Sequence, residues 1–317
     1  RCLLQEYFNT GRRGGETNNI IFCQRSVHSV GRLICGLRSL SAVNTLSGTG
    51  SCATIVRGKE RHINMGIISE TLSKSRKIGF RIGSNVLSTD KGTVNYSMME
   101  SLVEQVTELI ELGKQVIIVS SGAGICGVGA IGKWSRRNDI NYKQALCAIG
   151  QVELMMGYRE CFSKKDIHVG QMLLTREDFI DSERTLHIRN ALFTLVDEGV
   201  IPIINENDSV SVDEIKIGDN DTLSALTASL WNADVLVCLS DIDGVFDKDP
   251  KQNEDAGLIE VISDIESIFD SIDVTGKSEF GTGGIQTKIS AARRAGKYGI
   301  PTILLNGKKE QVIKNAL

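Results

Sequence analysis

The chain has 317 residues, of which 41% are hydrophobic and 24% charged, a composition typical of a globular protein with a buried core. A net charge of −3 argues against a nucleic-acid-binding surface, and no apolar run approaches the ~20 residues that a membrane span requires. These values leave a small molecule as the expected ligand, with neither nucleic acid nor membrane as a partner.

Residues 1–64 differ from the rest of the chain in charge and composition. Eight Arg and one Lys against three Glu give this segment a net charge of +6, so the remainder carries −9. The segment contains no Asp and shows no sustained periodicity. Three explanations stay open: an organellar transit peptide, a disordered tail, or sequence that precedes a start at Met65. We therefore expect an unstructured or non-native basic leader at 1–64, and a cytoplasmic location for the protein.

From residue 76 onward, apolar patterns of period two and period 3.6 alternate, which predicts alternating strands and helices. In chain order they are a strand at 77–82, a helix at 95–112, a strand at 115–120, a helix at 142–162, a strand at 167–174, a helix at 182–198, a strand at 200–204, a helix at 221–230, a strand at 234–239, a helix at 285–298 and a strand at 302–305. Ser182 is the expected cap of the helix that follows it. This alternation predicts one α/β domain over 76–317, with a mainly parallel sheet covered by helices on both faces.

Polar and glycine-rich loops follow the predicted strands, where ligands collect in such sheets. The loop at 81–85 joins a cation to Gly83, although a plain turn also explains it, and small residues follow at 120–124. Four polar residues occupy 205–208, and 240–246 is acidic. The loop at 281–288 opens a helix with three Gly, two Thr and a Lys, which suits polyphosphate binding, yet it is not a Walker A loop. The residues alone therefore predict an α/β enzyme for an anionic ligand such as a nucleotide, and they do not identify an acceptor.

Several of these segments together resemble the glutamate 5-kinase family, within the amino-acid kinase superfamily. The resemblance covers about three-quarters of the chain and rests on the motifs at 168–175, 204–208, 216–221, 223–226, 281–284 and 287–288, in the family's order and spacing. It implies an open sheet of about eight strands between helices. It also implies transfer of a phosphoryl group from ATP to L-glutamate, giving glutamyl 5-phosphate, the first step of proline biosynthesis. Mg²⁺, a homo-oligomer and feedback inhibition by proline are further implications, and no C-terminal RNA-modification-type domain is expected.

The resemblance also assigns roles to individual residues. It implies that Arg81 and Lys288 neutralise the transferred phosphoryl group, with Asp221 orienting them. The residues it implies for holding glutamate are Ser121, Asp208 and Asn220. The residues it implies for the nucleotide are Arg81, Ser240, Asp241, Thr282, Gly283, Gly284, Ile285, Gln286, Thr287 and Lys288. No metal ligand is assigned.

One departure from the family pattern is Arg81, because the family normally has Lys there. Arg keeps the charge but is larger and forked. We expect a working enzyme, with Ser84 and Asn85 as candidates for accommodating the larger side chain. Two alternatives stay open: a sister kinase for another carboxylate or a carbamate, and a degenerate kinase that senses glutamate or proline. Four cysteines in apolar surroundings are expected to be buried thiols in a reducing compartment: Cys126, Cys147, Cys161 and Cys238.

Overall fold

The computed structural model of the chain describes residues 19–22, 61–132, 139–210, 220–247, 253, 255–263, 265 and 284–317. Within these residues eight strands form one sheet in the order β4-β5-β3-β2-β6-β10-β1-β9, and a separate pair joins β7 to β8. The first six strands of that order are mutually parallel, whereas β1 runs antiparallel to β10. The strands are β1 (Asn19–Phe22), β2 (Lys77–Ile82), β3 (Gln115–Val119), β4 (Val169–Leu174), β5 (Ile201–Glu206), β6 (Val235–Ser240), β7 (Val245–Phe246), β8 (Leu258–Ile259), β9 (Val261–Ile262) and β10 (Thr302–Asn306).

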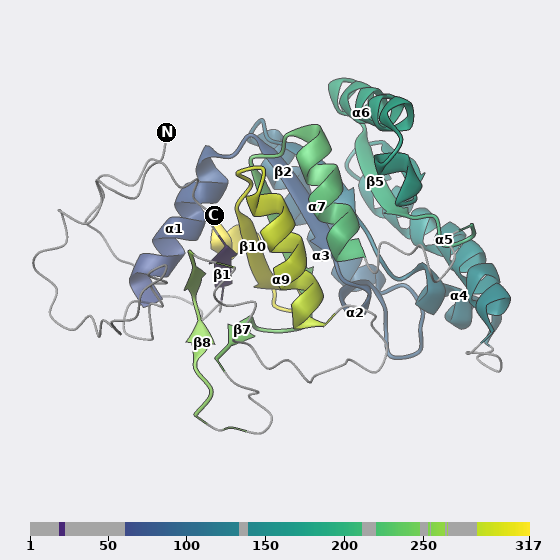
Figure 1. Ribbon diagram of the computed structural model, residues 1–317. Coiled ribbons are helices and arrows are strands. Elements are labelled where there is room, and N and C mark those ends of the chain that lie inside the picture. The colour runs from purple at the N-terminus through teal and green to yellow at the C-terminus, as the bar shows by residue number, and fades with distance from the viewer. Residues whose placement is uncertain are drawn as a thin grey trace, which may run out of the picture.

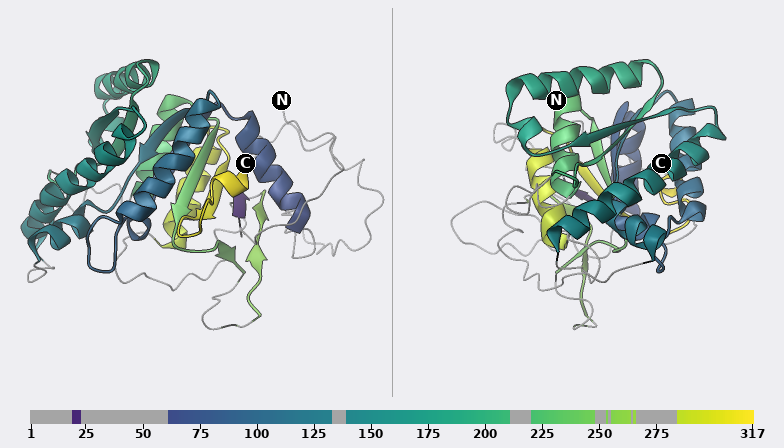
Figure 2. Two further views of the ribbon diagram at one scale, coloured as in Figure 1. Left: turned by 180° about the vertical axis from the view of Figure 1, so that it is seen from behind. Right: turned by 90° about the vertical axis from the view of Figure 1, so that its right-hand side faces the viewer.

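Helices cover both faces of this sheet (Figures 1 and 2). They are α1 (Arg61–Lys74), α2 (Ser84–Leu87), α3 (Tyr96–Glu111), α4 (Ala123–Ile131), α5 (Ile140–Ser163), α6 (Ser182–Asp197), α7 (Asn220–Trp231) and α9 (Ile285–Gly296), with 3₁₀ turns at Glu177–Phe179 and Lys314–Ala316. The predicted α/β fold with a mainly parallel sheet between helices is confirmed.

Most predicted elements agree with the structure to within two residues at each end, and the differences have physical reasons. The cap of α6 is Asp181, not Ser182, because the Asp181 carboxylate accepts hydrogen bonds from the backbone N–H groups of Glu183 and Arg184 at 2.9 and 2.8 Å. Strand β5 continues to Glu206, since its last residues pair with β4.

Two elements lie before the predicted start of the domain at residue 76. Helix α1 buries Ile68 and Leu72 in the core, and the Ser69 hydroxyl donates to the carbonyl of Leu317. Strand β1 lies inside the expected leader at 1–64, with Asn19 opposite Leu305 of β10. These contacts bring the start of the described chain against its end.

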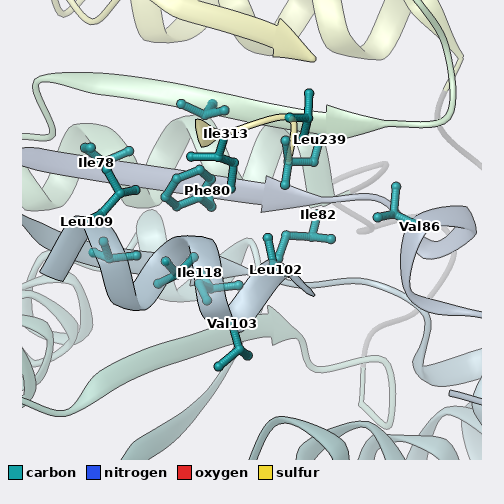
Figure 3. Packing of buried hydrophobic residues seen from close by; sticks show 14 of the residues in the cluster. Ile78, Phe80, Ile82, Val86, Leu102, Val103, Leu109, Ile118, Leu239 and Ile313 are labelled. Atoms are coloured by element: carbon teal, nitrogen blue, oxygen red, sulfur yellow. The ribbon is translucent and has the colours of Figure 1, made fainter. Parts of the chain in front are cut away.

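Strand β2 divides the core into two layers because its side chains alternate between the faces of the sheet. Ile78, Phe80 and Ile82 point toward α3 (Figure 3) and belong to the core cluster that also includes residues of α1 and α5. Gly79 faces the other way, where a Cβ would lie 3.8 Å from that of Ala228 in α7. The same alternation places Arg81 on the face covered by α7 and α9.

Helices α4 and α5 cross at unusually close range. A Cβ added to Gly150 would lie 1.8 Å from the carbonyl oxygen of Ala123, and one added to Gly127 would lie 1.9 Å from that of Leu146. No side chain fits at either position, so glycine is required for this approach. The crossing sets the middle of α5 directly against the start of α4, which follows the carboxyl end of β3.

Candidate active site

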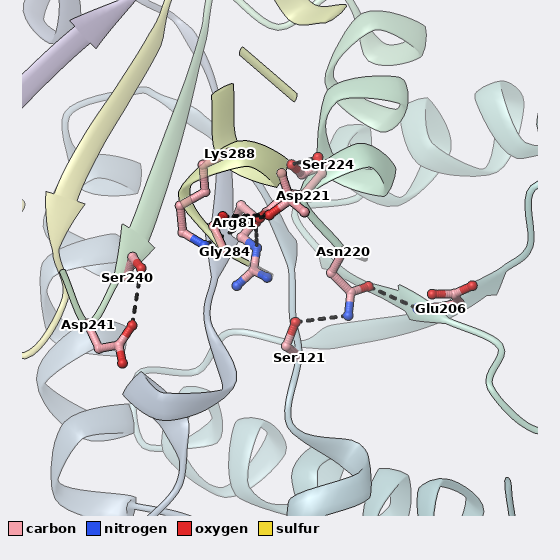
Figure 4. A network of polar contacts seen from close by, with 11 residues as sticks. Arg81, Ser121, Glu206, Asn220, Asp221, Ser224, Ser240, Asp241, Gly284 and Lys288 are labelled. Carbon is pink, nitrogen blue, oxygen red and sulfur yellow. Dashed lines mark hydrogen bonds and ion pairs between the residues drawn. The ribbon is translucent and has the colours of Figure 1, made fainter. Parts of the chain in front are cut away.

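The carboxyl ends of β2, β3, β5 and β6 lie at one edge of the sheet because these strands are parallel neighbours. Helices α7 and α9 begin at the same edge. The polar side chains that the sequence singled out meet here (Figure 4). Their arrangement is therefore fixed by the strand order and by the helix starts.

A buried carboxylate lies between two cations at the centre of this edge. Asp221 of α7 is 0% exposed, and its Oδ1 contacts Nε of Arg81 from β2. Its Oδ2 lies 3.3 Å from Nζ of Lys288 and accepts a hydrogen bond of 2.7 Å from the hydroxyl of Thr287, both in α9. Arg81 and Lys288 are each 6% exposed, so all three charges are withdrawn from water.

The pKa of Asp221 lies below its ordinary value. Burial acts most strongly and raises it, but the charges of Arg81 and Lys288, together with hydrogen bonds from Thr287 and Lys288, outweigh burial. The carboxylate is thus ionised at neutral pH. With two cations around one carboxylate, the cluster retains a net positive charge.

The Arg81 guanidinium has a nitrogen for which the described residues supply no hydrogen-bond acceptor. Its Nη1 is buried and has no hydrogen-bond partner within the described part of the chain. A Cβ on Gly83 would lie 3.1 Å from this atom, so glycine leaves the guanidinium room. A buried guanidinium nitrogen without a partner is costly, and an anionic oxygen is the group that best satisfies it.

A second polar group lies on one side of the cluster. Asn220, adjacent to Asp221, donates from Nδ2 to the Ser121 hydroxyl oxygen at 2.8 Å, and its Oδ1 accepts from the Glu206 backbone N–H at 3.3 Å. The same N–H donates to Asn205 Oδ1 at 2.9 Å, while Asn205 Nδ2 donates to Gln151 Oε1 at 2.7 Å. These contacts join the ends of β3 and β5 to α5 and α7.

A third group lies on the other side, at the end of β6. The Ser240 hydroxyl donates to Asp241 Oδ1 at 3.4 Å, and Asn85 Nδ2 donates to Asp241 Oδ2 at 2.8 Å. Burial raises the pKa of Asp241, but hydrogen bonds from Asn85 and the backbone, with nearby lysine charges, hold it below the ordinary value. Asn85 therefore pairs with Asp241, and it is Asp221 that contacts the Arg81 guanidinium.

The structure brings most of the predicted site residues to this edge. Arg81, Asp221 and Lys288 touch one another, Ser121 touches Asn220, and Ser240 touches Asp241. At the start of α9, Gly284 and Ile285 are half-buried and Gln286 is exposed.

Asp208 occupies a turn just after β5 and is half-buried. Thr282 and Gly283 lie outside the described residues, as do positions 211–219.

Gln151 is a residue of this edge that the sequence analysis missed. It is 8% exposed and lies on the buried face of α5, among Gly150, Leu154 and Tyr158. A polar residue on the apolar face of a helix was the available signal, because a buried amide needs partners.

No group of three or more His, Cys, Asp or Glu side chains in the described residues is arranged to hold a metal ion. The described helices include none with the length and apolarity to cross a membrane.

The cysteines partly follow the prediction. Cys126, Cys161 and Cys238 are buried, whereas Cys147 is half-buried. Burial, with a smaller effect from Glu153, raises the pKa of Cys126 to about 11, so this thiol is protonated at neutral pH.

Comparison with known proteins places these features in context. Residues 81–306 match the profile of the amino acid kinase family. The chain is 59% identical over 251 residues to the glutamate 5-kinase of Alkaliphilus metalliredigens, a match that covers 79% of this chain and 95% of the relative. It is 57% identical over 247 residues to the glutamate 5-kinase of Alkaliphilus oremlandii, covering 78% and 94%.

Solved structures with the same fold are more distant in sequence. An isopentenyl phosphate kinase aligns with a TM-score of 0.53 at 15% identity, over 75% of this chain and 94% of its own. A UMP kinase from Ureaplasma parvum aligns with a TM-score of 0.53 at 14% identity, over 76% and 94%. At this identity the likeness concerns the fold.

Proposed function

Because the chain belongs to the amino acid kinase family, within its glutamate 5-kinase group, we propose that it transfers the γ-phosphoryl group of ATP to the side-chain carboxylate of L-glutamate. The products are glutamyl 5-phosphate and ADP, and the reaction is the first step of proline biosynthesis. The observation that carries the proposal is the buried cluster of Arg81, Asp221 and Lys288 at the strand ends, where one guanidinium nitrogen has no partner among the described residues.

Catalysis rests on neutralising charge at the transferred group. A carboxylate oxygen of glutamate attacks the γ-phosphorus, a new O–P bond forms, and the bond from that phosphorus to the β–γ bridging oxygen breaks. The attacking carboxylate is ionised at neutral pH, so it needs no general base. Arg81 and Lys288 stabilise the negative charge on the phosphoryl oxygens, and Asp221 holds both cations in place.

The acceptor lies on the side of Asn220 and Ser121, whose mutual hydrogen bond fixes both side chains. These groups offer hydrogen bonds to glutamate. Asp208, in the turn after β5, offers a carboxylate for the ammonium group of the substrate. A site with both signs of charge suits an amino acid better than a simple dicarboxylic acid.

The nucleotide lies on the opposite side, near Ser240 and Asp241, with its phosphates at the start of α9. Residues Thr282 through Lys288 supply backbone N–H groups, hydroxyls and a cation there. We propose Mg²⁺ as the ion that accompanies ATP. The described residues do not form a Mg²⁺ site of their own, because Asp221 already binds two cations and no acidic cluster surrounds it.

Three further properties belong to the proposal. We expect a homo-oligomer, feedback inhibition by proline and a cytoplasmic location. Each follows from membership of the glutamate 5-kinase group, and each is testable separately by sedimentation, by inhibition kinetics and by cell fractionation.

The proposal is tested by ATP turnover with hydroxylamine present to trap an acyl phosphate. L-Glutamate, L-aspartate, N-acetyl-L-glutamate and carbamate are compared as acceptors. Hydroxamate formed with L-glutamate alone supports the proposal. Hydroxamate with another carboxylate, or ADP formation with carbamate, identifies a sister kinase instead. Binding of ATP and glutamate without turnover, with turnover restored by Arg81→Lys, identifies a sensor.

A further inference from the structure

The amide of Gln151 has a fixed orientation because its hydrogen-bond partners have fixed polarity. The Glu206 backbone N–H is a donor, so the atom of Asn205 that faces it at 2.9 Å is the oxygen. The Asn205 amide nitrogen therefore faces Gln151, and the 2.7 Å contact is accepted by Gln151 Oε1. The hydrogen-bond network therefore determines which end of the Gln151 amide is the oxygen and which is Nε2.

That nitrogen is buried inside the protein. Gln151 is 8% exposed, and its Nε2 has no hydrogen-bond partner among the described residues. An unsatisfied buried amide donor destabilises the folded protein. Such a group persists where a ligand supplies the acceptor.

The Glu206 backbone N–H starts two series of hydrogen bonds that run in the same donor-to-acceptor direction. The first passes through Asn205 to Gln151, and the second passes through Asn220 to Ser121. Glu206 N–H also donates to Asn220 Oδ1, and Asn220 Nδ2 donates to the oxygen of the Ser121 hydroxyl. This contact leaves the Ser121 hydroxyl hydrogen to be donated elsewhere. Both series thus end in a donor, one at Ser121 and one at Gln151. A group that only accepts hydrogen bonds, such as a carboxylate, satisfies both.

The fold explains why Gln151 belongs to this edge. The close crossing at Gly150 sets α5 against the start of α4, next to Ser121. Asn205, at the end of β5, links Gln151 to the polar group of Asn220 (Figure 4 shows Asn220, Ser121 and Glu206 on one side of Arg81). Along this network of contacts, Gln151 is further from the Arg81–Asp221–Lys288 cluster than Asn220 is, because Glu206 and Asn205 lie between them.

We infer that Gln151 is a substrate-binding residue whose Nε2 donates a hydrogen bond to the α-carboxylate of the acceptor, and so selects an acceptor with a free α-carboxylate. The inference rests on the proposed function, because the reacting side-chain carboxylate must lie at the cations. The α-carboxylate then lies at the far end of the same molecule, where Gln151 Nε2 needs an acceptor.

The test compares L-glutamate with its α-amide, L-isoglutamine, in wild type and in Gln151→Glu. This substitution keeps an oxygen to accept the Asn205 hydrogen bond, but it replaces the donor with a carboxylate oxygen. We expect kcat/KM for L-glutamate to fall about 10- to 100-fold, the effect of losing a hydrogen bond to a charged group. The preference for L-glutamate over the α-amide should fall at least ~10-fold, because the new carboxylate accepts from the amide and repels the α-carboxylate.

Two further variants control for structure. Gln105→Glu makes the same change at another buried glutamine, which is 4% exposed and whose Oε1 accepts from the backbone of Ile313 at 2.8 Å. It should leave the acceptor preference unchanged. Gln151→Met removes the amide at similar volume, and serves if Gln151→Glu does not fold. It should raise KM for L-glutamate about 10-fold or more, with KM for ATP unchanged.

Binding of L-glutamate, measured by calorimetry, distinguishes a failure of the inference about Gln151 from a failure of the proposed function. If wild type makes glutamyl hydroxamate but Gln151→Glu lowers activity with both acceptors equally, Gln151 has a structural role and the inference is overturned while the proposed function stands. If wild type neither binds nor phosphorylates L-glutamate, both are overturned. A selective loss of L-glutamate binding in Gln151→Glu supports the inference.

Discussion

Replacing Asp221 with Asn is the perturbation that acts most directly on the charge cluster. At 3.3 Å and an effective dielectric constant of about 20, the attraction between Lys288 Nζ and Asp221 Oδ2 is about 5 kcal/mol. Arg81 makes a comparable contact with the other oxygen, and the cost of burying the charges opposes both. Removing one partner of a buried ion pair costs roughly 3–5 kcal/mol, which corresponds to a fall in Tm of roughly 6–20 °C.

Activity should fall further than stability alone explains. Without the carboxylate, Arg81 and Lys288 repel each other and lose the positions from which they contact a phosphoryl group. We expect kcat of Asp221→Asn to fall at least ~10²-fold in the hydroxamate assay, at a temperature where the variant is folded. The matched control is Asp234→Asn, since Asp234 accepts from the backbone of Arg76 and Lys77 at the opposite end of β2. Wild-type kcat and Tm in Asp221→Asn would refute the reasoning.

The pH dependence of the stability difference between wild type and Asp221→Asn follows from the lowered pKa of Asp221. In the unfolded chain an Asp titrates near ~3.9, and in the folded protein the pKa lies lower. The stability that the ionised carboxylate contributes is therefore fully present above the unfolded value and is lost as the pH falls through the folded value. The difference in free energy of unfolding between wild type and Asp221→Asn should be constant from pH 6 to 8, and should shrink on acidification below about 4. A difference that shrinks at alkaline pH would contradict this assignment.

Four other substitutions, at Lys288, Arg81 and Gly150, test separate parts of the account. Lys288→Met should lower kcat about 10²- to 10³-fold with a smaller effect on KM for glutamate, and an effect on KM alone would contradict a role at the phosphoryl group. Arg81→Met should lose kcat to a similar extent, whereas Arg81→Lys keeps the charge and should retain activity within about tenfold of wild type. Gly150→Ala places a methyl 1.8 Å from the Ala123 carbonyl oxygen, so thermal melting should show a large loss of stability, and an unchanged Tm would contradict the α4–α5 crossing.

The sequence predicted the layers of this fold well because the signals were periodic. The run at 77–82 predicted strand β2, and the alternation of side chains along that strand explains the face on which Arg81 lies in the structure. Family resemblance then named Asp221 and Lys288, which are more than a hundred residues away from Arg81, and the structure places all three in contact. Periodicity alone carries no information about such long-range contacts.

The features that were missed have a weak local signal or none. Asp181 and Ser182 are both good capping residues, and only the geometry of the turn decides between them. The α4–α5 crossing depends on Gly127 and Gly150, which look unfavourable within a helix until the partner helix is placed. The orientation of the Gln151 amide depends on its hydrogen bond with Asn205, a residue 54 positions away.

Strand β1 has four residues and lies in a segment without periodicity, so only its pairing with β10 and β9 defines it. A strand this short gives no pattern that distinguishes it from a loop.

The most direct test of the central claim is to follow oxygen from the side-chain carboxylate of L-glutamate. Wild-type protein is supplied with ATP, hydroxylamine and L-glutamate labelled with ¹⁸O in both side-chain carboxylate oxygens, and the phosphate released is analysed by mass spectrometry. If the carboxylate attacks phosphorus, hydroxylamine cleaves the acyl phosphate at carbon, and each phosphate released carries one ¹⁸O. Phosphate without ¹⁸O, formed at the same rate with or without glutamate, would mean that water accepts the phosphoryl group and would contradict the proposed function.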